Sequence, residues 1–149
     1  MSADSKRRKV CIMENSLINS LKRLERVGSE TSRVTEKLKK AVEEVSQKIM
    51  ECIKPVLPER ESIYPDFTPI AEKLYYCKRC LIWDYDGYAD EITYTDYDLR
   101  PSEGYVKREV ALNFAAAIAN GLLKKIVSKV EKENAETLKQ MNVINSQEI

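Results

Sequence analysis

The stretch LINSLKRLERVGSETSRVTEKLKKAVEEVSQKIMECIKPV, residues 17–56, decides the fold of this chain. Apolar or small side chains recur in it at alternating steps of four and three residues, which places them along one side of an α-helix as a heptad seam. The seam consists of Leu17, Leu21, Leu24, Gly28, Thr31, Thr35, Leu38, Val42, Val45, Ile49, Cys52 and Val56. The stretch therefore predicts a long amphipathic helix that ends near Pro55 and Pro58.

The weakest part of this predicted helix is residues 28–32, Gly-Ser-Glu-Thr-Ser, where the seam loses its large apolar side chains. One continuous helix and a hairpin broken at Gly28 are both consistent with the pattern, and we prefer the continuous helix. A helix of 40 residues is about 60 Å long at 1.5 Å per residue, which exceeds the diameter of a compact domain of this size. We therefore predict at least a dimer, whose buried seam includes Leu38, Val42, Val45 and Ile49.

The middle of the chain predicts a turn and a small β module. Prolines at four positions within residues 55–69 predict a loop that reverses the chain. Thr68-Pro69 suits the start of a short helix, which would carry Ile70, Leu74, Cys77 and Leu81 at helical spacing, with a strand as the alternative. Asp86-Gly87 lies between aromatic and β-branched residues, so we predict a β-hairpin over about residues 81–99.

A second long helix is predicted from about Tyr105 to Met141, because apolar residues again recur at helical spacing. The predicted fold class is mainly α (α+β), with long N- and C-terminal amphipathic helices around a small central β-hairpin module. Residues 1–11 would be a flexible basic arm, 12–141 a single helical domain that contains the hairpin, and 142–149 a loose tail.

Composition narrows the class of protein. The chain is 33% charged and 43% hydrophobic, which is ordinary for a globular protein. Its most apolar run, residues 110–123, is shorter than the roughly 18–20 residues of a membrane span, and no secretory signal is recognisable at the N-terminus. We expect an intracellular protein, cytoplasmic or, in a eukaryote, nuclear.

The charge is unevenly distributed along the chain. Residues 1–60 carry 14 Lys and Arg against 9 Asp and Glu, whereas residues 61–105 carry 4 against 10. The net charges of these two segments are therefore +5 and −6. Such asymmetry indicates either separate partner surfaces or attraction between subunits.

The residues that commonly carry catalysis are scarce. The chain has no histidine, which excludes Ser-His and Cys-His catalysis. Cys77 and Cys80 have the spacing of half a zinc site or of a redox pair, but Cys11 and Cys52 are remote in sequence, so two buried, reduced thiols are the preferred interpretation. We predict no metal, no cofactor and no enzymatic activity, with a metal-dependent enzyme as a weaker third hypothesis.

The predicted hairpin is both acidic and aromatic. Six acids, and no Lys or Arg, fall within residues 84–98: Asp84, Asp86, Asp90, Glu91, Asp96 and Asp98. Their spacing does not match a calcium loop, so a charged hairpin edge is the preferred interpretation. An aromatic contact surface for a protein or for stacked bases would consist of Trp83, Tyr85, Tyr88 and Tyr94, with core packing as the alternative.

The basic N-terminal segment predicts contact with phosphate. A run of four cations is followed by cations on the long helix, and together they form the candidate nucleic-acid surface: Lys6, Arg7, Arg8, Lys9, Lys22, Arg23, Arg26 and Arg33. A solvated, salt-bridged helix face is an equally weighted alternative. The first hypothesis is a non-enzymatic, oligomeric protein that binds DNA or RNA. The second is a protein-interaction or assembly subunit whose acidic aromatic hairpin docks on a basic partner.

Overall fold

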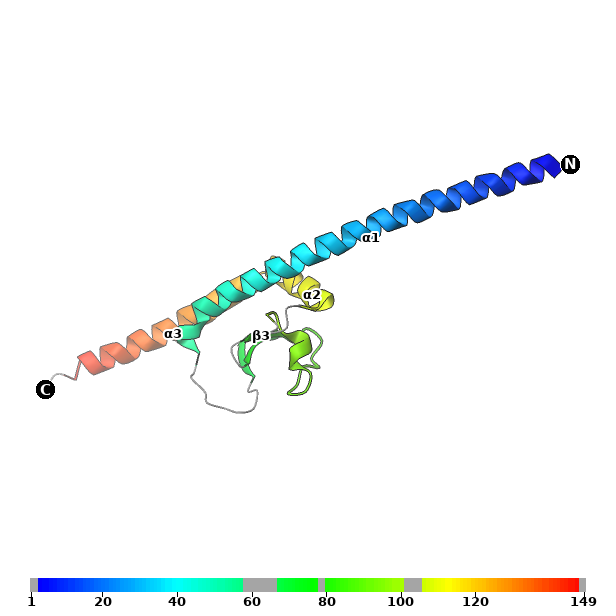
Figure 1. Cartoon of the computed structure of the whole chain (residues 1–149). Coiled ribbons are helices and arrows are strands. Elements are labelled where there is room, and N and C mark those ends of the chain that lie inside the picture. The colour runs from blue at the N-terminus through cyan, green and yellow to red at the C-terminus, as the bar shows by residue number, and fades with distance from the viewer. Residues whose placement is uncertain (1–2, 58–66, 78–79, 101–105, 148–149) are drawn as a thin grey trace. The chain divides into compact units, whose positions relative to one another are not determined.

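The structure, a computed structural model of the whole chain, describes residues 3–57, 67–77, 80–100 and 106–147, with side chains from residue 14 onward. Its elements follow the chain in this order (Figure 1): α1 (Ala3–Ile53), η1 (Lys54–Val56), β1 (Thr68–Ala71), β2 (Leu74–Cys77), β3 (Cys80–Trp83), η2 (Tyr94–Tyr97), α2 (Arg108–Ala119) and α3 (Leu122–Asn145). The three α-helices and the small sheet in the middle of the sequence confirm the predicted mainly α (α+β) class.

The chain divides into two compact units, Met1–Lys37 and Leu38–Ile149. The first unit is helical throughout its described residues, and α1 passes through Gly28 without a break, which confirms the continuous helix. Helix α1 already begins at Ala3, so the basic run at residues 6–9 belongs to a helix and not to the flexible arm predicted for residues 1–11.

The second unit has its own hydrophobic core, to which the last turns of α1 contribute. Val42 and Ile49 are buried, and Leu38 and Val45 pack partly buried against the same core, so this part of the predicted seam is buried within the chain itself. Cys52 is exposed, whereas Ile53 beside it is buried. At this end of α1 the buried position is therefore one residue later than the heptad predicts.

The strands β1, β2 and β3 form a three-stranded antiparallel sheet in that order. The predicted short helix from Thr68 is wrong, and the strand alternative is correct. The four residues at helical spacing are all buried: Ile70, Leu74, Cys77 and Leu81. Leu74 and Cys77 are three residues apart within β2 and therefore point to opposite faces of the sheet, so both faces carry buried residues and helical spacing arises without a helix. Lys73, between β1 and β2, has the left-handed φ of 66° that a tight turn requires.

The small central β module predicted from the sequence is confirmed, but its strands lie at β1, β2 and β3. Of the hairpin predicted over residues 81–99, the structure describes β3 as the first strand and one antiparallel bridge, between Ile82 and Asp98, in place of the second. After β3 the chain makes a turn, in which the Gly87 N–H donates to the Asp84 carbonyl (3.4 Å), and then continues through turns and η2. It returns to the sheet where the Leu99 N–H donates to the Leu81 carbonyl (2.9 Å). Carboxylates within this segment accept backbone N–H groups that a second strand would have used for pairing.

The second long helix predicted from the sequence is two helices. Gly121, at φ +99°, ends α2, and α3 continues at a bend of 70°. Helix α3 extends to Asn145, so residues 142–145 of the tail predicted for residues 142–149 are helical. Among the described residues, no single helix is long and apolar enough to cross a membrane; only α2 and α3 taken together, across their bend, meet that test.

Candidate interaction surfaces

The helix of the first unit carries a row of exposed apolar side chains. Six of them are between 48% and 67% exposed: Leu17, Ile18, Leu21, Leu24, Val27 and Val34. The five residues other than Ile18 are separated by four, three, three and seven positions, which places them along one side of the helix. We call this apolar surface the 17–34 face. Every described residue from 14 to 34 is exposed, so nothing in this unit covers the 17–34 face.

Val27 and Val34 are members of this face that the sequence pattern did not predict. Each lies one position before a small or polar residue of the predicted seam, Gly28 and Thr35 respectively. The step from Leu24 to Val27 is three residues where the heptad calls for four, and such a local change of register overwinds a coiled coil. Following apolar residues alone, without requiring the heptad, would have found both valines.

The cations predicted to bind nucleic acid are divided between described and undescribed side chains. Lys22, Arg23, Arg26 and Arg33 are all exposed on α1. Their spacing places Lys22, Arg26 and Arg33 together on the side of the helix opposite the 17–34 face, with Arg23 between the two. The side chains of Lys6, Arg7, Arg8 and Lys9 lie outside the described residues.

The acidic residues predicted to lie on the edge of a hairpin lie instead in a loop, and several of them stabilise it by hydrogen bonds. We call this segment, residues 84–98, the acidic loop. Asp90 is the clearest example, because its Oδ1 accepts hydrogen bonds from the backbone N–H of Ile92 and Thr93, both at 2.9 Å. These bonds favour the charged carboxylate and lower the pKa of Asp90. Asp84 and Asp86 act similarly, accepting from the N–H of Ala89 (2.9 Å) and of Tyr88 (3.1 Å).

Two tyrosines fasten the acidic loop through their hydroxyl groups. Tyr97 donates to Asp86 Oδ2 (2.9 Å), and Tyr85 donates to Glu109 Oε2 on α2 (3.2 Å). The hydrogen bond to the Asp86 carboxylate raises the pKa of Tyr97 to about 12. Desolvation, and then the bond to Glu109, raises the pKa of Tyr85. Both phenols are therefore neutral hydrogen-bond donors at physiological pH.

The end of the acidic loop is anchored in the core. Asp98 is buried, and burial raises the pKa of its carboxyl group, while the hydrogen bond that its Oδ1 accepts from the Arg100 N–H (2.7 Å) acts in the opposite direction. The Arg100 side chain donates to Gln47 Oε1 on α1. The exposed Asp96 pairs with Lys107 at 2.8 Å.

The four residues predicted as an aromatic contact surface do not share one surface. Trp83 is 4% exposed and belongs to the core, where its ring meets Phe114 edge-on at 5.6 Å and its Nε1–H points to Asn113 Oδ1 (3.4 Å). Tyr85 and Tyr94 are half-buried. Tyr88 alone of the four is fully exposed, at 76%, together with Ile92 at 89%. The alternation of a hairpin strand, which led to the prediction, does not exist in this loop.

Cys77 and Cys80 are cross-strand neighbours at the ends of β2 and β3. Cys77 is fully buried, and the Cys80 thiol donates to the Cys77 carbonyl at 2.8 Å. Burial, and then the charge of Asp98, raises the pKa of Cys80, which opposes formation of the reactive thiolate. Among the described residues, no group of three or more Cys, Asp or Glu could hold a metal ion.

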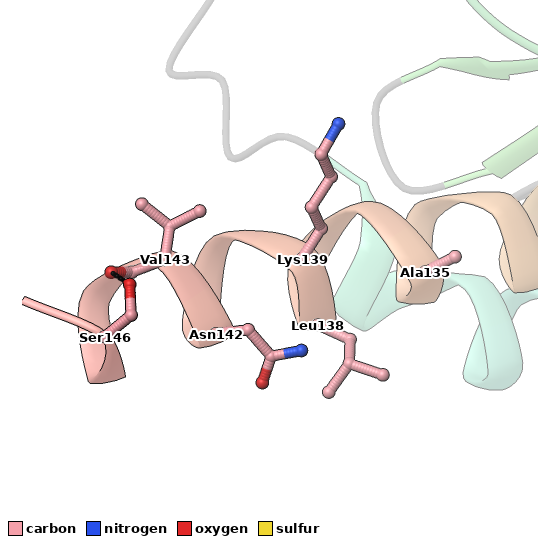
Figure 2. A pocket seen from close by; sticks show the side chains of 6 residues that line it. All are labelled: Ala135, Leu138, Lys139, Asn142, Val143 and Ser146. Atoms are coloured by element: carbon pink, nitrogen blue, oxygen red, sulfur yellow. Dashed lines mark hydrogen bonds between the residues drawn. The ribbon is translucent and has the colours of Figure 1, made fainter.

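Two hollows occur on helix α3, and neither resembles an active site. Figure 2 shows the first, lined by Ala135, Leu138, Lys139, Asn142, Val143 and Ser146. All six side chains come from one exposed helix and point to different sides of it, so the hollow has no opposing wall. The second, of about 350 Å³, is lined mostly by apolar residues of α1, η1, β1 and α3, with Lys129 and Glu133 as its charged members. Their opposite charges indicate no single ligand chemistry.

Comparison of the chain with protein-family models, with characterised proteins and with solved structures finds no match.

Proposed function

We propose that this protein is a non-enzymatic assembly subunit that binds further copies of itself through the 17–34 face of α1. The observation that carries the proposal is the exposure of this face along the first unit. Single exposed apolar residues are normal, but a continuous row of them marks a partner site. Burying one such side chain fully contributes about 1.5–3 kcal/mol, so several together can hold two helices in register.

The length of the face supports a helical partner. Leu17 and Val34 are 17 positions apart, about 25 Å along a helix at 1.5 Å per residue. An apolar stripe of this length suits another amphipathic helix, and the same helix of a second copy supplies an identical stripe. Two identical faces form an isologous, closed contact, the commonest arrangement of homo-oligomers.

Sedimentation equilibrium over micromolar concentrations tests this proposal with matched variants. Leu21→Asp with Leu24→Asp places two charges in the 17–34 face, and the dimer should dissociate because unpaired charges are costly to bury. Asn19→Asp with Ser29→Asp adds the same charge on the other side of the helix and should leave the dimer intact. A monomeric unmodified protein at all concentrations, or equal effects of the two pairs, would refute the proposal.

The second candidate function is nucleic-acid binding by the basic side of the same helix. It is supported by the exposed cations Lys22, Arg26 and Arg33, which a dimer through the opposite face would leave free to follow a phosphate backbone. This candidate is compatible with the first, because the two functions use different sides of α1.

Fluorescence anisotropy against single- and double-stranded oligonucleotides at several salt concentrations tests the second candidate. Arg26→Ala with Arg33→Ala should weaken binding for all sequences and reduce the salt dependence, since each lost phosphate contact lowers the slope by about one. Lys132→Ala with Lys139→Ala, on the exposed part of α3, is the matched control. If the unmodified protein shows no salt-dependent binding at low ionic strength, this candidate is removed.

A further inference from the structure

Helix α3 carries a row of residues at alternating steps of three and four positions, which is the spacing of a heptad seam. The row, which we call the α3 seam, consists of Val127, Val130, Asn134, Thr137, Met141 and Ile144. Val130 is half-buried against the core of the second unit, and the other five residues are exposed. We propose that the α3 seam pairs with the α3 seam of a second copy as a parallel, two-stranded coiled coil. This contact lies outside the 17–34 face and does not require it.

The second half of α3 is helical without packing on the rest of the second unit. All residues from 131 to 145 are exposed, so no described part of the chain covers this length of helix. Within it, Met141 is 49% and Ile144 72% exposed. A helix of this length gains most of its stability when its apolar side packs against another element, and a partner helix would supply that packing.

Two polar residues lie in the middle of the α3 seam, and their side chains differ in hydrogen bonding. The Thr137 hydroxyl donates to the Glu133 carbonyl within the helix (2.9 Å), so the methyl group of Thr137 is available to pack against a partner. The Asn134 side chain is exposed and has no hydrogen-bond partner among the described residues. A partner that covers the seam must therefore supply hydrogen bonds to Asn134, because a buried amide without them is unfavourable.

Asn134 favours a second copy of this chain as the partner. Its amide group both donates and accepts, so two Asn134 side chains at the same level satisfy each other. Val127, Asn134 and Met141 occupy the a positions of the heptad, and in a parallel pair each a residue faces the same residue of the partner. A single Asn at an a position fixes both the register and the two-stranded state. An entirely apolar partner helix would leave the Asn134 amide buried and unsatisfied.

The residues beside the α3 seam are compatible with a parallel pair. Leu138, which is 54% exposed, would face Glu133 of the second copy and pack on its methylene groups, and Gln140 would face Asn145. No two like charges therefore meet at these flanking positions. Val143 is also exposed, but it points to a different side of the helix from Leu138 and lies outside the seam (Figure 2).

Pairing through the α3 seam should be weaker than pairing through the 17–34 face. Two of the six seam residues are polar, and an Asn at an a position lowers the stability of a coiled coil while it fixes the register. The full chain should therefore form a dimer through α1 at low concentration. At higher concentration, contacts between the α3 helices of different dimers should build larger species.

Sedimentation equilibrium on the full chain, from the micromolar to the millimolar range, tests the inference. Met141→Asp with Ile144→Asp should remove the larger species and leave the dimer, because the charges would be buried without partners. Ala135→Asp with Asn142→Asp adds the same charge at exposed positions outside the seam and should leave the larger species intact. An unmodified protein that stops at the dimer, or equal effects of the two pairs, overturns the inference and leaves the proposed function intact.

Leu21→Asp with Leu24→Asp separates the two contacts. This variant lacks the dimer through the 17–34 face but keeps the α3 seam, so it should be monomeric at micromolar concentrations and dimeric near the millimolar range. Adding Met141→Asp with Ile144→Asp should keep it monomeric throughout. If the variant with only the two α1 substitutions stays monomeric at every concentration, the inference is overturned and the proposed function stands.

A cysteine substitution measures the orientation of the paired helices. Cys11→Ser and Cys52→Ser first remove the two thiols of α1. In this background Met141→Cys should form a disulfide between two copies under mild oxidation, because residue 141 faces itself across a parallel seam. Asn142→Cys, one position away from the seam, is the control and should stay reduced. Non-reducing electrophoresis and peptide mass spectrometry identify the product, and equal yields from the two variants, or none from either, overturn the inference.

Discussion

At the scale of single residues, the acidic loop shows how carboxylates replace regular pairing. Asp86 accepts from the Tyr88 N–H with one oxygen and from the Tyr97 hydroxyl with the other, so one side chain closes a turn and joins two segments. Such local bonds compete with strand formation, which is why Asp is depleted in strands. Four of the six acids of this segment therefore shape the loop by accepting backbone N–H groups: Asp84, Asp86, Asp90 and Asp98.

The Asp86–Tyr97 bond has a pH dependence that can be measured. The pKa of Tyr97 is raised to about 12, above the ordinary value of about 10 for tyrosine, so the neutral phenol is favoured in the folded protein. The stability contributed by this shift is complete below about pH 10 and is lost as the pH rises from about 10 to 12. In Asp86→Asn the negative charge is absent, and the pKa of Tyr97 should move back toward its ordinary value.

NMR of isotope-labelled tyrosines during an alkaline titration measures this change. Asp96→Asn is the control, because Asp96 pairs with Lys107 and makes no hydrogen bond to a tyrosine within the part of the chain that the structure describes. An unshifted Tyr97 in the unmodified protein, or equal effects of the two substitutions, would contradict the assignment.

Replacing Trp83 by alanine should lower the free energy of unfolding far more than replacing Tyr88 by alanine. Trp83 is 4% exposed and packs on Phe114, so Trp83→Ala should lower the free energy of unfolding by about 3–5 kcal/mol. Tyr88→Ala should change it by no more than about 0.5 kcal/mol, since the side chain stands in water. Urea unfolding followed by circular dichroism measures both. Similar losses would mean that Tyr88 packs against the fold and is not available to a partner.

At the scale of elements, two glycines illustrate opposite uses of the same residue. Gly28 lies inside the straight run of α1 with nothing near the position of a Cβ, and its backbone is helical. Gly121 has a left-handed backbone and separates α2 from α3. The first glycine therefore weakens a helix that forms in spite of it, and the second permits the bend of 70°.

Substitution by alanine should change the free energy of unfolding in opposite directions at these two positions. Gly28→Ala should stabilise the helix by about 0.8–1 kcal/mol, because alanine has the higher helix propensity, and should increase the helical circular dichroism signal. Gly121→Ala should destabilise the protein by roughly 1–2 kcal/mol, because an L-residue is strained at positive φ. Thermal unfolding of both variants distinguishes these outcomes. A stabilising Gly121→Ala would indicate that α2 and α3 join into one straight helix.

The helices and strands differ in how well the spacing of apolar residues in the sequence predicts them. The spacing of residues 17–56 identified α1 as a long amphipathic helix, whereas its passage through Gly28 was a preference between two interpretations, since the pattern is equally consistent with a break there. Residues 68–83 were ambiguous, since Ile70, Leu74, Cys77 and Leu81 have helical spacing and yet are buried in three short strands. The break at Gly121 was missed because apolar residues continue on both sides of it.

The candidate surfaces were predicted less completely than the fold. Exposed cations on α1 can be read from composition, because Lys and Arg are rarely buried. Trp83 and Tyr88 could not be distinguished, since which aromatic residue enters the core depends on loop geometry that residues 84–98 do not reveal by periodicity. The exposure of Leu17, Leu21 and Leu24 also depends on where the core of the second unit ends, which is a property of the tertiary structure.

At the scale of the whole molecule, the division into two units places the hydrophobic core in the second unit. The buried residues of the hydrophobic core that the structure describes run from Val42 to Ile126, within the second unit. The described side chains of the first unit, residues 14–37, include exposed apolar and basic groups and none of those core residues. The fold of the second unit should therefore depend little on residues 1–37, whereas the proposed dimer depends on them entirely.

Removal of residues 1–37 tests this separation directly. The shortened chain keeps Val42, Ile49 and Ile53, which tertiary packing rather than helix propensity holds in place. It should unfold cooperatively in urea, with a midpoint close to that of the full chain at concentrations where the full chain is monomeric. Sedimentation equilibrium should find it monomeric at concentrations where the full chain is a dimer, because it lacks the 17–34 face. Loss of cooperative unfolding would show that the first unit supports the core. A shortened chain that still dimerises would place the dimer contact in the second unit. The exposed Leu138 and Met141 of α3 would then be the next residues to replace.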